Sequence, residues 1–239
     1  MGAHEKVKSP TITVEGITYL RIPVRTHVIM AGEDMAEVAW KYCQDIVQSG
    51  DTLFLSEKAT AASQGRAIPV DKINPSALAR FLSKRVKKVS YGIGLGSPET
   101  MEMAIQEVGM CRILLASAVH VVSRLFGRSG DFYRVAGMQA ALIDGAADYV
   151  IPPYNKYVTL GPKDPDKVAK RVAERLKVKA TIVDVNDIGG SWVIGASDGV
   201  DRKLVEKILL DNPLGQSLEQ TPIGIIRLAK SQVSETHHS

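Results

Sequence analysis

Apolar and polar residues alternate at the start of the chain. Between residues 11 and 25, β-branched and aromatic side chains recur at nearly every second position, and the dipeptide Glu15-Gly16 interrupts them. A period of two is typical of strands that bury one face, and a short interruption containing glycine is typical of a hairpin turn. We therefore expect the chain to open with a β-hairpin.

The next segments have the spacing of a helix and then of a strand. Residues 33–47 place their apolar side chains on one stripe, which predicts an amphipathic helix ended by Ser49-Gly50. The apolar run at residues 52–55 has the length of a short buried strand. A polar stretch at residues 56–66 follows directly and is a candidate for chemistry.

Capping residues mark two helices in the middle of the chain. Asn74-Pro75-Ser76 precedes one apolar-periodic segment, and Pro98 opens another that stops at Gly109. Asparagine and serine accept the free amide hydrogens of a helix start, and proline favours early helical positions. Residues 112–125 are apolar enough to be buried, and their pattern fits a strand or a helix equally.

The second half of the chain continues to alternate between strand and helix patterns. We expect strands at residues 149–151, 157–160, 180–185 and 223–226, and helices near residues 164–176 and 203–210. Strands that alternate with helices in this way predict a mixed α/β (α+β) fold.

The least patterned region, residues 127–145, is the candidate boundary within the chain. It suggests an N-terminal lobe of residues 1–130 and a C-terminal lobe of residues 131–230, unless the two are interleaved as one domain. The polar residues 231–239 are expected to form a disordered tail.

Composition narrows the class of protein. The 239 residues carry a formal net charge of +4, and only 5% of them are aromatic, so a nucleic-acid surface is poorly supplied with stacking side chains. A module that binds anions or nucleic acid through the mild basic excess is the weaker alternative. Cys43 and Cys111 have no partner at disulfide or zinc spacing. Without an apolar leader or a membrane-length apolar run, the sequence predicts a cytoplasmic address and no membrane partner.

The strongest candidate site follows the predicted strand that ends near residue 183. Asp184, Asn186 and Asp187 supply three oxygen-bearing side chains there, and Gly189-Gly190 lets a ligand approach the backbone. Such a group at the end of a strand suits a hard cation that carries phosphates. The alternative is a turn rich in Asp and Asn.

Three weaker candidates lie elsewhere. The loop containing Gly215-Gln216 is dense in oxygen donors and could supply further ligands to the same cation, although such a loop is often only a loop. Lys58 and Arg66 flank a polar segment and could hold an anion, with surface salt bridges as the alternative. Asp144 follows an apolar run, where a turn is the commoner reading.

Other signals carry less weight. Gly92, Gly94 and Gly96 imitate a dinucleotide fingerprint with the wrong spacing, and His27 and His120 are isolated in apolar surroundings. The chain has neither a Gly-x-Ser-x-Gly elbow nor a Walker lysine loop, which removes the usual hydrolase and P-loop hypotheses.

At these same segments the chain resembles the coenzyme F-420-0:L-glutamate ligase family, in a divergent bacterial form. The resemblance covers nearly the whole chain and is carried by four stretches, LFLSEKATAASQGRAIP, LGPKDPDKVAKRV, TIVDVNDIGG and DNPLGQSLEQTPIGIIR. Two family positions differ: Asn186 stands in the register of a metal-binding acid, and Gln139 stands where an Ala-Gly-(Ile/Val)-Asp motif has its aspartate.

The resemblance implies a two-lobed fold, an intertwined homodimer and a ligase that uses GTP with Mg or Mn. It implies that an acceptor carboxylate of a deazaflavin-like molecule is joined to L-glutamate through an acyl phosphate. The implied residues are Asp144, Asp184, Asp187 and Gln216 for the metal, Lys58 and Arg66 for catalysis, and Ser56, Gln64, Gly65, Gly189 and Gly215 for the nucleotide. Glu219 is expected to support the metal ligands. The alternative is a paralogue that keeps the metal and nucleotide pocket but uses a folate-like acceptor or has no ligase activity.

Overall fold

The fold is mixed α/β and is built on one six-stranded sheet in the order β1-β2-β8-β3-β6-β7. The computed structural model describes residues 9–86, 94–128, 130–186, 190–215 and 219–229. The strands of the sheet are β1 (Thr11–Val14), β2 (Ile17–Val24), β3 (Thr52–Ser56), β6 (Lys179–Asn186), β7 (Gly190–Ala196) and β8 (Ile223–Leu228). Strands from the two ends of the sequence therefore alternate within a single sheet.

One pair of strands is parallel and the others are antiparallel. β3 and β6 run in the same direction, with Ser56 opposite Val183, while β8 lies between β2 and β3 and opposes both. β1 and β2 form the expected hairpin, and its turn residues Glu15 and Gly16 both have positive φ. A two-residue turn with positive φ at both positions matches the twist of the strands that it joins.

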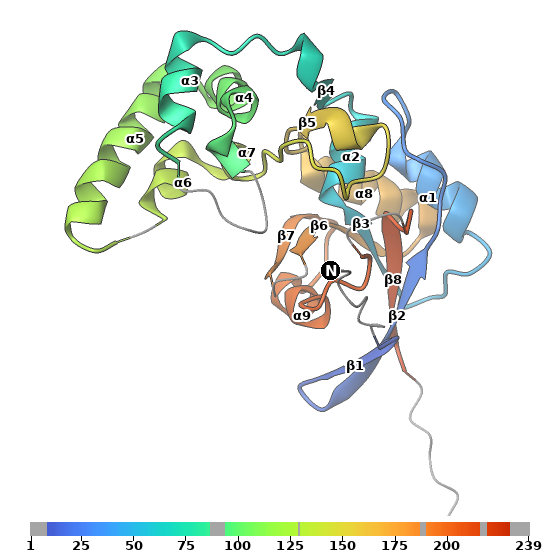
Figure 1. Cartoon of the computed structure of the whole chain (residues 1–239). Coiled ribbons are helices and arrows are strands. Elements are labelled where there is room, and N and C mark those ends of the chain that lie inside the picture. The colour runs from blue at the N-terminus through green and yellow to red at the C-terminus, as the bar shows by residue number, and fades with distance from the viewer. Residues whose placement is uncertain (1–8, 87–93, 129, 187–189, 216–218, 230–239) are drawn as a thin grey trace, which may run out of the picture.

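Helices cover both faces of this sheet (Figure 1). The helices that belong to it are α1 (Met35–Cys43), α2 (Glu57–Ser63), α8 (Pro165–Leu176) and α9 (Arg202–Ile208). α1 and α8 pack on one face, where Leu53 and Leu55 point, and α9 packs on the other, where Phe54 points. Successive residues of β3 thus enter opposite cores, as the pleat of a strand requires. We call this part the sheet region.

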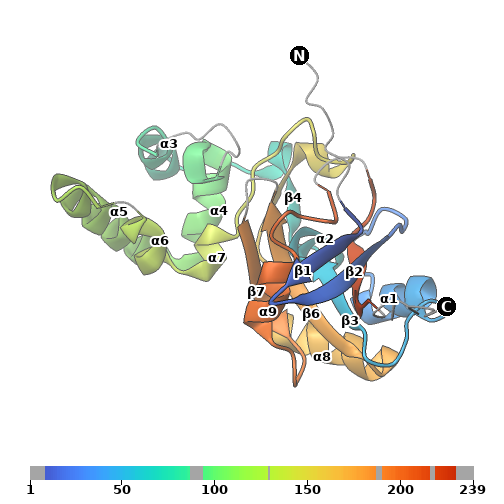
Figure 2. The ribbon, with the colours of Figure 1, turned by 90° about the horizontal axis from the view of Figure 1, so that it is seen from below.

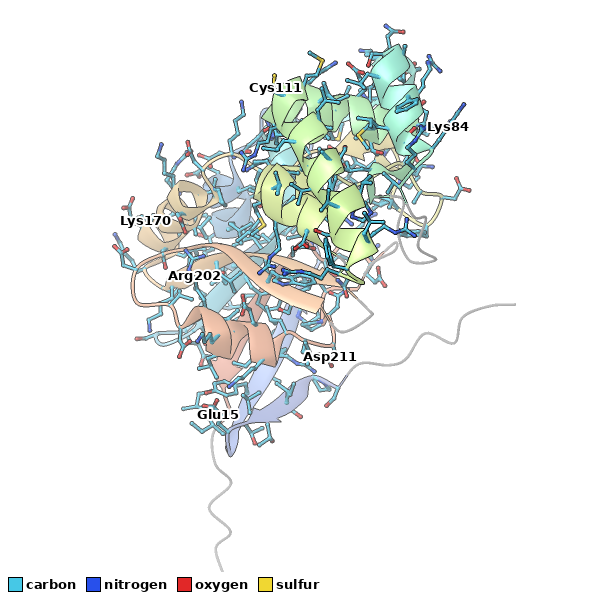
Figure 3. The ribbon with its side chains drawn as sticks, turned by 90° about the vertical axis from the view of Figure 1, so that its left-hand side faces the viewer. Glu15, Lys84, Cys111, Lys170, Arg202 and Asp211 are labelled. Atoms are coloured by element: carbon cyan, nitrogen blue, oxygen red, sulfur yellow. The ribbon has the colours of Figure 1, made fainter. Side chains whose placement is uncertain are left out.

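The remaining helices form a separate group that extends to one side of the sheet (Figures 1 and 2). They are α3 (Ala77–Ser83), α4 (Pro98–Val108), α5 (Met110–Leu125), α6 (Asp131–Ala136) and α7 (Met138–Ala141), with 3-10 turns η1 (Val70–Lys72), η2 (Gly94–Gly96) and η3 (Tyr154–Lys156) nearby. We call α3 to α7 the helical region. Figure 3 shows Cys111 on this region, and Arg202 and Glu15 on the sheet region.

A two-stranded ribbon joins the two regions. β4 (Ala67–Pro69) pairs antiparallel with β5 (Tyr157–Thr159), so the chain enters and leaves the helical region side by side. The expected boundary near residue 130 falls between α5 and α6, which are linked by a hydrogen bond of 2.8 Å from Arg112 Nε to the carbonyl oxygen of Val135. The helical region encloses its own small core, which includes Met101, Ile113 and Ile143.

Most of the predicted elements are confirmed, with three differences. Residues 149–151 form a turn instead of a strand, because prolines 152 and 153 offer no amide hydrogen to a neighbouring strand. The polar stretch after β3 forms helix α2, since Ser56 accepts a hydrogen bond from the Ala59 amide and alanines follow. The ambiguous apolar run is helix α5, and it is mostly exposed instead of buried.

No single helix in the described part of the chain is long and apolar enough to cross a membrane. Helices α4 and α5, bent by 116° relative to each other, reach that length and apolar composition only when taken together.

Candidate functional site

A cavity of about 570 Å³ lies where the parallel pairing of β3 with β6 ends. Because Ser56 and Val183 are paired, the residues that follow them, Glu57 and Asp184, reach the same edge of the sheet. Both line the cavity, together with residues 141–145 from beyond α7 and the loop before β8. Ligands of α/β proteins commonly bind at the carboxyl ends of parallel strands. We call this space the edge cavity.

An ion pair between Lys58 and Asp144 lies in the edge cavity. Lys58 Nζ is 2.8 Å from Asp144 Oδ2, and both side chains are about half exposed. The backbone of Asp144 is fixed by two hydrogen bonds of 2.9 Å with that of Thr159, one in each direction. Burial alone would lower the pKa of Lys58, but the carboxylate of Asp144 outweighs it and raises that pKa. Lys58 is therefore a fixed cation at neutral pH.

Two other carboxyl groups of the cavity have raised pKa values. Burial, reinforced by the charge of Asp144, raises the pKa of Asp184. Burial, together with Asp144 and Asp184, raises the pKa of Glu57 well above its ordinary value. Glu57 is only 3% exposed, and its Oε1 has no hydrogen-bond partner among the described residues. A cation entering the cavity would favour the ionised form of both groups.

The side chains that line the cavity are rich in the carboxylate oxygens that divalent cations bind. The described lining residues include four carboxyl side chains, Glu57, Asp144, Asp184 and Glu219, against one lysine. Oxygen ligands of this kind suit Mg²⁺ or Mn²⁺. Within the described ranges, however, no three His, Cys, Asp or Glu side chains are grouped closely enough to hold a metal. The predicted ligands Asp187 and Gln216, and the predicted nucleotide contact Gly189, lie outside the described residues.

Two of the predicted nucleotide contacts line the edge cavity. The side chain of Ser56 caps α2, and the residue is part of the lining. Gly215 lines it as well, with a φ of +78°, and a Cβ atom there would lie 2.6 Å from the carboxylate of Glu219. The positive φ favours glycine at this position, and the nearby carboxylate is the end of a flexible side chain that could shift.

Gln64 and Gly65 are not among the residues that line the cavity. The side chain of Gln64 makes two hydrogen bonds with the backbone of Lys163, of 2.9 and 2.7 Å. Gly65 ends α2 with a φ of +70°. In this structure both residues fix the turn between α2 and β4.

Arg66 also lies outside the lining, where it connects the two regions. Its Nε donates to the carbonyl oxygen of Gly161 at 2.5 Å, and its Nη2 donates to Glu107 Oε1 of α4 at 2.7 Å. Both side chains of the ion pair are largely buried. The structure therefore brings Lys58, Asp144 and Asp184 together and places Arg66 in a separate brace.

An aromatic wall forms another side of the cavity. Tyr149, Tyr154, Tyr157 and Trp192 line it, and the rings of Tyr154 and Tyr157 meet edge to face at 5.4 Å. Tyr154 is anchored by a hydrogen bond of 2.5 Å from its hydroxyl to the carbonyl oxygen of Ile29. The cavity lining thus combines charged side chains with aromatic rings.

The histidine discounted from the sequence has structural partners. His27 lines the cavity, but its Nδ1 is 2.8 Å from the Tyr42 hydroxyl and its Nε2 is 2.5 Å from Glu33 Oε2. Both ring nitrogens of His27 thus have partners, whereas Nδ1 of His120, the other discounted histidine, has no hydrogen-bond partner among the described residues.

Sequence reasoning missed Glu57 and the aromatic wall. Glu57 precedes Lys58 directly, and an acidic residue that follows a buried strand was a usable signal. Three tyrosines at positions 149, 154 and 157 were a second signal, hidden because the segment resembled a strand.

Comparison with known proteins identifies a family for this chain. Residues 23–188 match the model of the F420-0:Gamma-glutamyl ligase family. Over 168 residues the chain is 25% identical to a protein from Methanopyrus kandleri named coenzyme F420:L-glutamate ligase. The match covers 70% of this chain but only 55% of that relative, so the chain spans about half the relative's length.

Proposed function

Because the chain belongs to the F420-0:Gamma-glutamyl ligase family, we propose that it joins an acceptor carboxylate to L-glutamate through an amide bond. The observation that carries the proposal is the edge cavity itself. It combines the fixed Lys58–Asp144 pair, the carboxyl group of Asp184 and a wall of aromatic rings.

The reaction needs an activated acceptor, since a carboxylate does not condense with an amine in water. In the proposed scheme a carboxylate oxygen of the acceptor attacks the γ-phosphorus of GTP, the bond to GDP breaks, and an acyl phosphate forms. The amine of glutamate then attacks the acyl carbon and loses a proton as phosphate leaves. A bound Mg²⁺ or Mn²⁺ would neutralise the charge on the phosphate oxygens during the first transfer.

The described residues supply positioning and charge for these steps. Lys58, held by Asp144, offers a fixed ammonium to an anionic oxygen of the acceptor or the phosphate. Asp144 and Asp184 are the carboxylates that would hold the cation, with Asp187 and Gln216 as further ligands in the proposal. Ser56 and Gly215 lie where a phosphate would approach the backbone.

The aromatic wall supports a flat acceptor. Tyr149 and Trp192 are half exposed, so their rings have free area for a heterocycle to stack on. We propose a deazaflavin-like acceptor, in keeping with the name of the Methanopyrus kandleri relative. A folate-like acceptor has a similar flat ring and a carboxylate at the other end, and is the alternative.

A homodimer belongs to the same proposal, in the two-lobed, intertwined form that the resemblance implies. Helix α5 buries Ile113 and Ala116 and exposes large apolar side chains along the rest of its length. Leu125 is 81% exposed and Phe126 is 77% exposed. A second copy packed on this face would remove these side chains from water, which is the main gain in homodimer interfaces.

The test is direct. Purified protein is incubated with GTP, Mg²⁺ or Mn²⁺, L-glutamate and a panel of deazaflavin and folate acceptors, and products are read by mass spectrometry. We expect one glutamyl mass increment on an acceptor, with one phosphate released per amide. Lys58→Ala should lower the rate by about a hundredfold or more, because the fixed charge is lost.

A matched control is Lys170→Ala, which removes an exposed lysine of α8 that pairs with Asp198 and lies outside the edge cavity. It should keep the wild-type rate. Tight nucleotide binding without glutamyl transfer to any acceptor would contradict the ligase and favour the paralogue that only binds metal and nucleotide.

A further inference from the structure

Glu57 has an environment that the proposed ligands of the cation do not explain. It is the first residue of α2, it lines the edge cavity, and 97% of its surface is covered. No hydrogen-bond partner of its Oε1 is found in the described ranges. Buried polar atoms are almost always paired, so an unpaired carboxyl oxygen on a residue that lines a cavity points to a partner that arrives with a ligand.

The neighbouring side chains do not offer that partner. The ammonium of Lys58 is directed to Asp144, and the hydroxyl of Ser56 accepts from the Ala59 amide. Asp144 and Asp184 act on Glu57 as like charges, because each raises its pKa. For the ionised carboxylate the missing partner is a hydrogen donor, and the surrounding negative charges favour a cation.

A helix-terminal role for Glu57 is an insufficient explanation. An acidic residue in the first turn of a helix interacts favourably with the helix dipole, but it does so equally well at a solvent-exposed position. Burial of this side chain adds a desolvation cost that the helix does not require. The position of Glu57 is better explained by what enters the cavity.

The proposed function already assigns the metal ion to Asp144 and Asp184, so an amine is the cationic partner to consider for Glu57. In the described ranges the carboxyl groups are not grouped closely enough for three of them to hold one metal. An amine differs from a metal in needing only one or two acceptors, each along an N–H bond. Of the substrates proposed above, GTP and the acceptor carboxylate are anions, and only glutamate carries an ammonium group.

We infer that Glu57 binds the amino group of the incoming amino acid and positions its nitrogen toward the acyl carbon. This inference rests on the proposed function and adds a specificity-determining residue to it. Glu57 would then distinguish an α-amino acid from a plain dicarboxylate, because only the amino acid supplies the missing donor.

The experiment compares two ligands that differ in this one group. Binding of L-glutamate and of glutarate, which lacks the amine, is measured by calorimetry with Mg²⁺ and a non-hydrolysable GTP analogue present. We expect the wild type to prefer L-glutamate by about tenfold or more, as befits one charge-assisted hydrogen bond in a buried site. Glu57→Gln should abolish this preference and leave the affinity for glutarate and for the analogue unchanged.

Asp148→Asn is the matched control, since it removes one negative charge from an exposed residue between two lining residues. It should keep the preference, which separates direct contact from a general field effect. A thermal scan checks that Glu57→Gln is folded. Glu57→Met is a second variant, which has neither a charged group nor an amide. In a turnover assay, Glu57→Gln should raise KM for glutamate while KM for GTP stays constant.

Two results would overturn the inference. One is a wild type that does not prefer L-glutamate over glutarate, and the other is a Glu57→Gln protein that keeps the preference. Neither result depends on the formation of product, so the amine site and the ligase reaction are judged separately. Glutamyl transfer that continues with unchanged KM values in Glu57→Gln would refute the amine site while the ligase stands.

Discussion

The sheet region and the helical region differ in how far their apolar side chains are buried. In the sheet region both faces of the sheet are covered, and Leu53, Phe54 and Leu55 of β3 are completely buried. In the helical region α5 has two buried residues, Ile113 and Ala116, among its sixteen. The core of the sheet is thus covered on both faces, whereas most apolar side chains of α5 are exposed in the described part of the chain.

This difference indicates which region depends on other molecules. A monomer rarely exposes a large continuous apolar patch unless the patch binds something. The edge cavity lies between the two regions, with Asp184 on the sheet side and Asp144 on the segment that returns from the helices.

The largest contrast is expected from the same substitution in each region. Phe54→Ala opens a cavity in the sheet core and should lower the free energy of unfolding by about 3–5 kcal/mol. Phe81→Ala in α3 removes a ring that is 53% exposed and should cost less than about 1 kcal/mol. Urea unfolding followed by circular dichroism measures both, and equal losses would erase the contrast.

Charges on α5 should break the proposed dimer. Leu115 and Val122 lie on one stripe of the helix and are exposed, so Leu115→Glu combined with Val122→Glu would place four carboxylates in a two-fold contact. We expect dimerisation to weaken by about a hundredfold, or roughly 2.8 kcal/mol. Light scattering after size exclusion reads the mass.

Leu210→Glu is the control for the dimer, because Leu210 is an exposed leucine of the sheet region. It should leave the mass unchanged. A wild-type protein that stays monomeric at all concentrations would show that α5 is not covered by a second copy.

The smallest contrast concerns pH. Burial raises the pKa of Glu102 in α4, but hydrogen bonds from Ser76 outweigh burial and lower it. Glu102 therefore stabilises the fold at pH values above 4.5, the ordinary pKa of a glutamate. Burial raises the pKa of Glu57. Its contribution to the free energy of unfolding is therefore fully present at low pH and declines as the pH rises above 4.5. At pH 7 we expect Glu102→Gln to destabilise by about 1–2 kcal/mol and Glu57→Gln to stabilise by about 1 kcal/mol.

Unfolding free energies measured from pH 4 to pH 8 test both the loss of stability expected for Glu102→Gln and the gain expected for Glu57→Gln. The difference between wild type and Glu102→Gln should shrink as pH falls, and that between wild type and Glu57→Gln should shrink as well. Parallel curves for wild type and Glu57→Gln would mean that Glu57 titrates normally in the folded protein.

Local signals predicted much of the fold. The hairpin turn at Glu15-Gly16, the caps at Ser76 and Pro98 and the strand of Leu53 to Leu55 follow from residues that are close in sequence. Pairing partners did not follow, because β8 is inserted between β2 and β3 by contacts that join distant parts of the chain. Exposure of α5 was also invisible, since apolar periodicity reports a helix without saying whether anything covers it.

The site was predicted in part for the same reason. Asp184 and Lys58 were found because each lies near the end of an apolar strand pattern, and the parallel pairing of β3 and β6 then brings them to one edge. Glu57 was missed because its burial depends on Asp144, Asp184 and the cavity walls, which no local pattern encodes. Arg66 looked like an anion ligand, yet the structure directs it to Glu107 and Gly161.

The β4–β5 ribbon makes the segment between its strands exchangeable. Pro69 and Tyr157 are register partners, so everything between them leaves and re-enters at one point, and its length can change without shifting any strand of the main sheet. That inserted segment includes Asp144, Tyr149 and Tyr154. Recombination at the ribbon would therefore exchange Asp144 and the aromatic residues of this segment together. The acceptor specificity could then change while Asp184, on the main sheet, is kept.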